Sequence, residues 1–207
     1  DLNALNSNER SDWHHILIDR WIKENKLGEG CGWEPYPTSL RIINWIKWDL
    51  NGNSLKNNWL HSLEIQTRFL SQNIENHLMG NHLFANAKAL VFAGLFFDGE
   101  EAKRWYVKGC NILKRELSEQ ILPDGGNFEL STMYHIIFLE DLLDLVNIHR
   151  AYGYELPDKL EKNVQPMFSW LLNMCHPDGE ISFFNDAALD ITPSVEEIQH
   201  YGQKLEL

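Results

Sequence analysis

Three polar residues open an apolar segment near the middle of the chain. Asn81 and His82 follow Gly80, and Asn86 lies one helical turn further on, in the first turn of a helix that looks buried from Leu83 onward. An imidazole exchanges protons near neutral pH, and an asparagine amide donates hydrogen bonds without ionising. Burying either group without a partner costs about 1–3 kcal/mol. We therefore expect these side chains either to be satisfied by neighbours or to face a cleft.

Helices must position these groups, because helical spacing of apolar residues dominates the chain and alternating, strand-like runs are nearly absent. Asp98 with Glu101 and Ser194 with Glu197 form capping-box patterns, and Pro193 stands where a first-turn proline is tolerated. The predicted fold is all-α. The predicted helices cover about 12–25, 39–49, 55–77, 83–96, 100–119, 130–152, 158–174 and 194–203.

Four polar, Gly/Pro-rich loops recur at intervals of about 45–55 residues, enough for one out-and-back helical hairpin. They cover 32–37, 80–82, 123–127 and 177–180, and Pro-Asp-Gly occurs in the last two. Hairpins of equal length return the chain to the same end, so the loops are expected to share one rim, as in a helical solenoid or an α/α toroid. Because Pro-Asp-Gly is a common turn signal, chance duplication is the alternative.

Composition limits the partners. The 207 residues are 43% hydrophobic, enough for one domain or a large part of one. The net charge of −12 argues against nucleic acid. The longest apolar run, 89–97, is too short to cross a bilayer, which predicts a soluble protein with no membrane partner. The three cysteines are scattered, and the histidines lack metal-ligand spacing, so neither a metal nor another cofactor is predicted.

Three segments, taken in order, resemble the N-terminal α/α-toroid domain of the heparinase II/III-like polysaccharide lyases. They are Gly80-Asn81-His82 with the helix at 87–97, the stretch 122–135, and its continuation at 139–145; looser similarity runs from about 33 to 186. The resemblance implies that residues 1–207 form an incomplete α/α toroid, a single helical domain or part of one. It also implies a C-terminal β-sandwich domain in the full-length parent, absent here, and a periplasmic or secreted location in a bacterium. No signal peptide is visible in this chain.

Lyases of this family cleave acidic polysaccharides that contain uronic acid, such as glycosaminoglycans or alginate, by β-elimination. By resemblance, Asn81 offsets the charge of the substrate carboxylate, and His82 is the base or a second donor. Tyr134 is the acid, and in some relatives also the base. A tyrosine, with an ordinary pKa of about 10, acts as a base only if a nearby cation lowers that value. His135 and Arg41 are the candidates for that cation.

Each assignment has a structural alternative. Asn81 could cap the helix that starts at Leu83, and His82 could be a structural histidine satisfied by its neighbours. Tyr134 lies on an apolar helix face, where core packing with a tethered hydroxyl is the alternative. For Asn86, holding the His82 ring and contacting substrate are equally expected.

Further substrate contacts are predicted on the polar loops. Trp33 and Tyr36 form a candidate platform for stacking on a sugar ring. Glu129 precedes the helix of Tyr134, and its carboxylate could instead stabilise the N-terminus of that helix. Asn185 and Asp186, which follow the fourth loop, could instead cap a turn. The full set of predicted substrate-binding residues is Trp33, Glu34, Tyr36, Arg41, Asn86, Glu129, His135, Asn185 and Asp186.

Two other functions stay open. A glycoside hydrolase on the same scaffold needs two carboxylates about 5–10 Å apart, which Glu34, Glu129 and Asp186 could supply. A glycan-binding module without catalysis fits the negative charge and the missing second domain. Sulfate recognition calls for clustered cations. Few cations are candidates for binding sulfate, which favours a non-sulfated acidic glycan as the substrate. These candidates are Arg20, Arg41, Lys47, Arg68 and Lys88.

Overall fold

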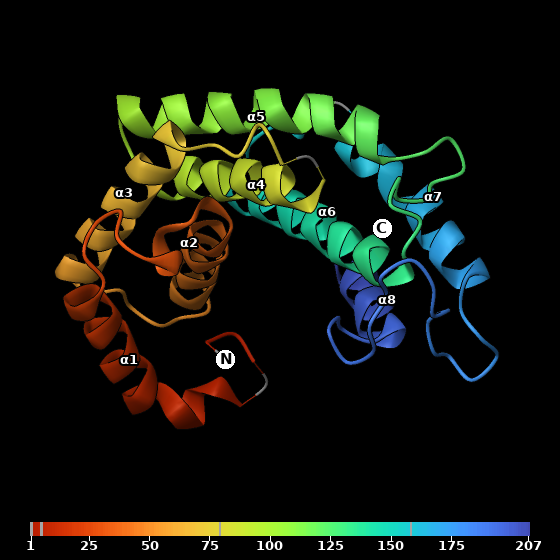
Figure 1. Ribbon diagram of the computed structural model, residues 1–207, viewed down its shortest axis with the longest axis horizontal. Coiled ribbons are helices and arrows are strands. Elements are labelled where there is room, and N and C mark those ends of the chain that lie inside the picture. The colour runs from red at the N-terminus through yellow and green to blue at the C-terminus, as the bar shows by residue number, and fades with distance from the viewer. Residues whose placement is uncertain (1, 5, 79, 158) are drawn as a thin grey trace. The chain divides into compact units, whose positions relative to one another are not determined.

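Helices make up the regular secondary structure of the described part of the chain. The computed structural model describes residues 2–4, 6–78, 80–157 and 159–207, and these form α-helices and short 3-10 helices without a strand (Figure 1). The all-α prediction is confirmed. The chain divides into two compact units, residues 1–109 and 110–207, and each is described by itself. The assignment of 1–207 to a single domain stays a prediction.

The first unit is built around one buried helix. Its elements are η1 (Ser7–Arg10), α1 (Ser11–Glu24), η2 (Cys31–Trp33), α2 (Pro35–Leu50), α3 (Asn57–Gln72), α4 (Asn81–Phe96) and the first half of α5 (Glu100–Gln120). In Figure 1, α2 lies against α4, and α3 packs against both of them. Every residue of α4 from Leu83 to Leu95 is buried. A helix that is apolar all round is stable only inside a core, so α4 is the centre of this unit.

Two helix boundaries differ from the prediction by more than two residues, and both differences affect the site. Helix α2 begins at Pro35, four residues before the predicted start at Ser39, because a proline is favoured at the first helical position. Helix α3 ends at Gln72, whereas the predicted helix runs on to His77. The residues after Gln72 therefore form a connection rather than a helix, and this connection carries Glu75.

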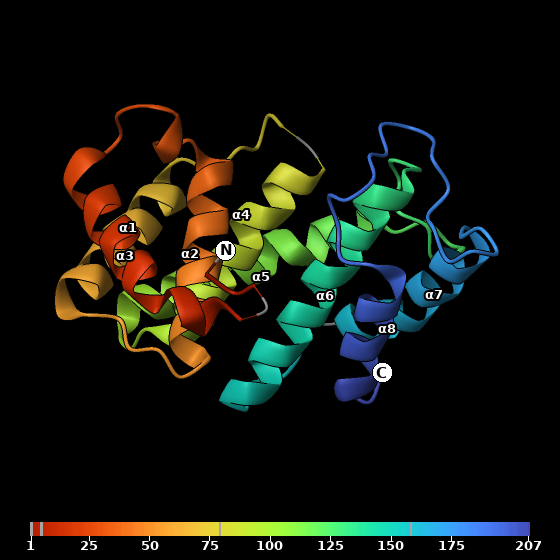
Figure 2. The ribbon, with the colours of Figure 1, turned by 90° about the horizontal axis from the view of Figure 1, so that it is seen from below.

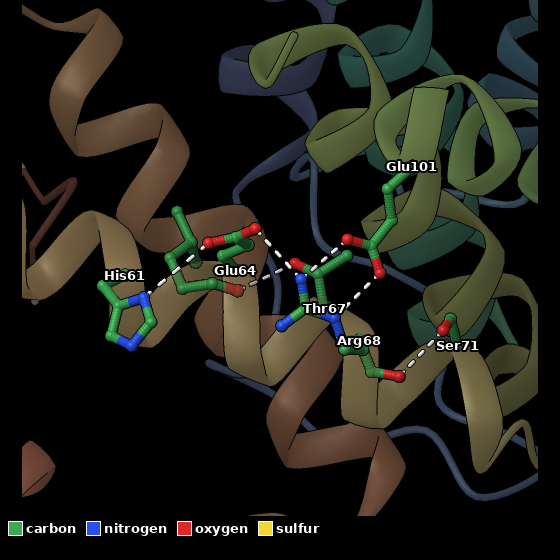
Figure 3. A network of polar contacts seen from close by, with 7 residues as sticks. His61, Glu64, Thr67, Arg68, Ser71 and Glu101 are labelled. Atoms are coloured by element: carbon green, nitrogen blue, oxygen red, sulfur yellow. Dashed lines mark hydrogen bonds and ion pairs between the residues drawn. The ribbon is translucent and has the colours of Figure 1, made fainter. Parts of the chain in front are cut away.

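A polar network ties α3 to α5 on the surface of the first unit (Figure 3). Arg68 Nε and Nη2 donate to the two carboxylate oxygens of Glu101 at 2.8 and 2.7 Å, and Nη2 also donates to Glu64 at 3.0 Å. The carboxylate of Glu101, predicted to form a capping box with Asp98, thus has both oxygens bonded to Arg68. Because the Arg68 side chain is 40% exposed, the pair contributes at most about 1 kcal/mol. The main consequence of the pair is that the Arg68 guanidinium already donates hydrogen bonds to two carboxylates of the protein.

The second unit contains the rest of α5, followed by α6 (Thr132–Tyr152), α7 (Leu160–Asn173) and α8 (Val195–Lys204). Helix α6 packs against α7 and α8 (Figure 2). The predicted capping box at the start of α8 is confirmed, since Ser194 Oγ accepts from the Glu197 N–H and the Glu197 carboxylate accepts from the Ser194 N–H. Pro193 lies just outside the helix rather than in its first turn.

The two Pro-Asp-Gly loops fold in the same way. In each, the aspartate Oδ1 accepts from the backbone N–H two residues later at 3.0 Å, and the glycine has a positive φ, 91° and 90°. A β-bridge closes each turn, joining Ile121 to Asn127 and Cys175 to Ile181, 54 positions further on. Hydrogen bonds and backbone angles both correspond, so the two loops adopt one turn conformation; their interpretation as a structural repeat stays a prediction.

Candidate functional site

The first two polar loops meet at the N-terminal ends of α2 and α4. Tyr36 lies in the first turn of α2 and His82 in the first turn of α4. Their rings stack with centroids 4.3 Å apart and planes inclined by 24°. The predicted meeting of polar loops is therefore confirmed for this pair.

Asn81 is the first residue of α4, not its cap. The capping position belongs to Gly80, whose φ of 76° suits a glycine, and no side chain caps this helix end. The alternative in which Asn81 caps the helix is therefore wrong. The Asn81 side chain is half-buried and forms no hydrogen bond with the other described residues, so its amide is available to donate to a ligand.

A buried carboxylate holds one nitrogen of His82. His82 Nδ1 lies 3.4 Å from Glu75 Oε1, and the side chains are 37% and 9% exposed, respectively. A carboxylate only accepts hydrogen bonds, so a neutral His82 ring carries its proton on Nδ1 and keeps the lone pair on Nε2. None of the described residues bonds Nε2. The ring is thus arranged to accept a proton at Nε2.

Asn86 secures this carboxylate from inside α4. It is 0% exposed. Its Oδ1 accepts from the Glu75 N–H at 3.0 Å, while Nδ2 donates to Glu75 Oε2 at 3.2 Å and to Ser39 Oγ at 3.1 Å. Of the two expected roles, the structure supports holding the His82 ring, here through Glu75. Direct contact between Asn86 and a substrate is ruled out by its burial.

Glu75 and Ser39 are not among the residues predicted from the sequence. Glu75 falls inside the predicted helix 55–77, where a glutamate is expected to face solvent. The available signal was Asn73, a residue type that disfavours helix interiors and stands where α3 ends. A correct helix end would have placed Glu75 in the loop before Asn81.

A cleft of about 490 Å³ lies next to the contacts between His82, Glu75 and Asn86, and Glu75 is one of the residues that line it. Its lining also includes Trp33 and Glu34 of the first polar loop, with Phe69 of α3. Trp33 is 5% exposed, and its ring packs against Phe69 at 5.2 Å and Trp21 at 5.5 Å. This burial favours a packing role for Trp33. Stacking of a sugar on Trp33 and Tyr36, and a contact from Glu34, stay predictions.

Arg41 is held within the first unit. Its guanidinium lies 3.7 Å from the ring centre of Trp21 and donates to Gln66 Oε1 at 2.6 Å and to the Gly32 carbonyl at 2.8 Å. Burial lowers the pKa of Arg41 to about 9, which leaves it charged at neutral pH. Tyr134, on which this cation is predicted to act, belongs to the second unit, so that role stays a prediction.

Tyr134 lies in the first turn of α6. Its backbone N–H is capped by Ser131 Oγ at 3.4 Å. The side chain is half-buried, and its hydroxyl makes no hydrogen bond to any described residue. Asn81 and His82 belong to the first unit and Tyr134 to the second, so the convergence of these three residues stays a prediction.

His135, the neighbour of Tyr134, is neutral and internal. It is 0% exposed, its Nδ1 accepts from the Asn127 N–H at 3.2 Å, and its Nε2 donates to the Met167 carbonyl at 2.9 Å. Burial lowers the pKa of His135 to about 4, although the Met167 carbonyl and Asp124 act in the opposite direction. The prediction that His135 supplies a cation is therefore wrong. Its burial also removes it from the predicted substrate contacts.

The burial of His135 predicts acid sensitivity. The pKa of about 4 in the folded state lies below an unfolded value of about 6.5. The associated stability is therefore complete above pH 6.5 and is lost as the pH falls toward 4. Between pH 7 and 4.5 the free energy of unfolding should drop by about 2–3 kcal/mol from this group. His135→Gln, which keeps an acceptor and a donor but cannot titrate, should lose less over this range.

Urea denaturation of both proteins at pH 7 and 4.5 measures that difference. The comparison also cancels the contribution of His149 to the loss of stability, because its pKa is likewise lowered by burial in both proteins. Equal losses in the wild type and the variant would contradict the assignment of a buried neutral ring to His135.

The segments that follow the third and fourth loops are in contact within the second unit. Asn185 Nδ2 donates to the Leu130 carbonyl at 3.1 Å. Asn185 and Asp186 both have positive φ values, 50° and 60°, as turn residues do. Asn185 therefore has a structural role here. Glu129 is half-buried, and its N–H donates to Asn127 Oδ1 at 3.0 Å. Substrate contacts from Glu129, Asn185 and Asp186 stay predictions.

Neither a metal-holding cluster nor a membrane-spanning helix is found among the described residues. No group of three or more His, Cys, Asp or Glu side chains is arranged to hold a metal ion. In the same ranges, no helix combines the length and apolarity that a membrane crossing requires.

A family model described as Heparinase II/III N-terminus matches residues 16–204. The chain belongs to this family, and the resemblance found in the sequence is confirmed.

Curated relatives and solved structures agree with this assignment. A heparin-sulfate lyase of Bacteroides stercoris is 34% identical over 125 residues, 59% of this chain and 18% of the relative. That of Pedobacter heparinus is 29% identical over 197 residues, 85% of this chain and 28% of the relative. A structure titled Crystal Structure of Heparinase III shares the fold, with a TM-score of 0.77 at 21% identity, covering 97% of this chain and 34% of the other. The chain thus spans about a fifth to a third of these proteins.

Proposed function

We propose that this chain is the helical domain of a lyase that cleaves a uronic-acid-containing polysaccharide by β-elimination. One observation carries the proposal: two adjacent residues at the start of α4 present a free amide and a free imidazole nitrogen. Asn81 has no partner among the described residues, and His82 is held through Nδ1 by Glu75. An amide donor beside a proton acceptor is what elimination next to a carboxylate requires.

Each group has a definite step in the proposed reaction. Asn81 donates to the uronate carboxylate as its charge grows, and removal of one such donor typically costs on the order of 10²–10³ in rate. His82 Nε2 accepts the C5 proton. The electron pair of that C–H bond forms the new C4–C5 double bond, and the C4–O bond breaks. Tyr134 gives its proton to the departing oxygen.

The substrate we propose is a heparan-sulfate-type glycan, cleaved where sulfate groups are few. Relatives of the chain are named heparin-sulfate lyases. Within the first unit, Arg41 is bonded to Gln66 and Arg68 to Glu101, while Arg20 forms an exposed pair with Glu24. Lys88 is 3% exposed. The internal contacts of Arg41 and Arg68 and the burial of Lys88 favour a substrate region that is recognised by its uronate rather than by its sulfates.

Two parts of the proposal concern the whole protein. We propose that a C-terminal β-sandwich domain completes the active site, and that the protein acts in the periplasm or outside a bacterial cell. Both follow from the family resemblance. The hydrolase alternative needs two carboxylates that face each other, and no observation on Glu34, Glu129 or Asp186 supports such a pair.

The test is the product formed by the full-length protein. Heparan sulfate, an unsulfated polymer of the same backbone, and alginate are incubated with it separately. We expect ultraviolet absorbance from an unsaturated uronate with the first two polymers and little with alginate. Cleavage that gives new reducing ends without this absorbance would show hydrolysis. Binding of oligosaccharide by calorimetry without any cleavage would show a binding module.

A further inference from the structure

A buried carboxylate lies behind His82, and the proposed reaction does not consume it. Glu75 is 7% exposed, and a buried charge is retained only where it is paired and hydrogen-bonded. Among the described residues no lysine or arginine bonds it. Its side-chain partners are the His82 ring and the Asn86 amide. The carboxylate is therefore positioned for the imidazole.

We infer that Glu75 is a positioning residue that fixes the tautomer and orientation of His82, with Asn86 and Ser39 fixing Glu75 in turn. The inference rests on the proposed function in taking His82 as the group that accepts the substrate proton. The statement about the tautomer concerns the protein alone.

The hydrogen bonds that hold Glu75 from Ser39 and Asn86 form one consistent set of directions. Ser39 Oγ donates to the Pro35 carbonyl at 2.8 Å, so it accepts from Asn86 Nδ2. With Nδ2 facing Ser39 and Glu75 Oε2, Asn86 Oδ1 is left to accept from the Glu75 N–H. One orientation of the amide satisfies all these contacts. Asn86 thus holds both the backbone and the carboxylate of Glu75.

The His82 ring is restrained in two directions. Glu75 approaches Nδ1 at 3.4 Å, and Tyr36 stacks on the ring with centroids 4.3 Å apart. The first contact sets which nitrogen carries the proton, and the second limits the tilt of the ring. Removing the hydrogen-bond partner of a metal-ligating histidine typically changes activity by about 10–100-fold, and we expect an effect of the same order for His82.

Glu75→Gln is the informative substitution because the network predicts how the new amide must turn. Asn86 Nδ2 requires an acceptor, so the oxygen of the new amide faces Asn86 and its NH₂ group faces His82 Nδ1. Nδ1 then becomes an acceptor, and the proton of the neutral ring moves to Nε2. The variant keeps its shape but presents the wrong tautomer to a substrate.

Histidine ¹⁵N NMR of the protein at neutral pH reads the tautomer directly. The signal that disappears in His82→Gln identifies the residue. We expect the Nδ1–H tautomer in the wild type and the Nε2–H tautomer in Glu75→Gln. The control is Glu64→Gln, which removes a carboxylate bonded to Arg68 on the same helix and should leave the His82 signals unchanged.

Kinetics on the full-length protein complete the test. We expect Glu75→Gln to lower kcat about 10–100-fold with KM within about threefold, and Glu64→Gln to match the wild type. An Nε2–H tautomer in the wild type overturns the inference, and this measurement needs no variant to fold. Unchanged kcat in a folded Glu75→Gln overturns it as well. If the wild type forms no unsaturated product, the proposed function fails, while the NMR result still decides the role of Glu75.

Discussion

Tyr134→Phe in the full-length protein is expected to abolish measurable β-elimination while leaving the fold intact. The proposed acid loses only its hydroxyl, and loss of a positioned proton donor typically costs roughly 10²–10⁴ in rate. That hydroxyl bonds none of the described residues, so its removal breaks no internal contact. The rate of appearance of unsaturated uronate and the urea midpoint should therefore respond differently, the first falling sharply and the second staying unchanged.

Tyr201→Phe is the matched control for this substitution. The Tyr201 hydroxyl donates to Asp144 Oδ1 and accepts from Asn147 Nδ2, both at 3.0 Å. Its loss should lower the free energy of unfolding by about 1 kcal/mol and leave turnover unchanged. If Tyr134→Phe retains more than about a third of the wild-type kcat, Tyr134 is not the acid.

Gly125→Ala is expected to produce the largest loss of stability. Gly125 has a φ of 91°, and a Cβ there would lie 2.3 Å from the carbonyl oxygen of Pro166 in α7. The atoms that this Cβ would meet first belong to the Pro166 backbone, so no flexible side chain can move aside. The positive φ and the clash together should cost about 3–5 kcal/mol, in the range that marks a severe packing conflict. Urea denaturation followed by circular dichroism measures it.

The second Pro-Asp-Gly turn supplies a control at the corresponding position. Gly179 has nearly the same φ, 90°, but a Cβ there would meet no atom within 4 Å. Gly179→Ala should therefore cost only the backbone term, about 1–2 kcal/mol. Equal losses in the two variants would mean that the contact between the first Pro-Asp-Gly turn and α7 does not limit stability.

The helices could be predicted because their apolar spacing is a local property. The predicted range 100–119 corresponds to α5 (Glu100–Gln120), and 130–152 to α6 (Thr132–Tyr152). The errors occurred where local and distant contacts compete. Around Glu75 the helical pattern continues past the end of α3, but the hydrogen bonds to Asn86 in α4 hold the backbone in a connection instead.

The candidate site was predictable in its residue types and less so in its contacts. Asn81, His82 and Asn86 could be singled out because polar groups are unusual beside a buried helix. The assignment of a cation to His135 failed because sequence does not reveal burial. Burial, with Trp170 stacked 4.5 Å away and the Asn127 N–H donating to Nδ1, keeps that ring neutral. Ser39 gave no signal, since its role depends on an amide 47 positions later.

The hydrogen-bonded chain from Ser39 to His82 closes over a short stretch of sequence, from Pro35 to Asn86. A chain emerging from the ribosome folds its N-terminal part first, so the proton-accepting half of the proposed site can assemble before Tyr134 has been synthesised. Every contact that holds the proposed proton acceptor thus lies within the first unit, whereas the proposed proton donor belongs to the second.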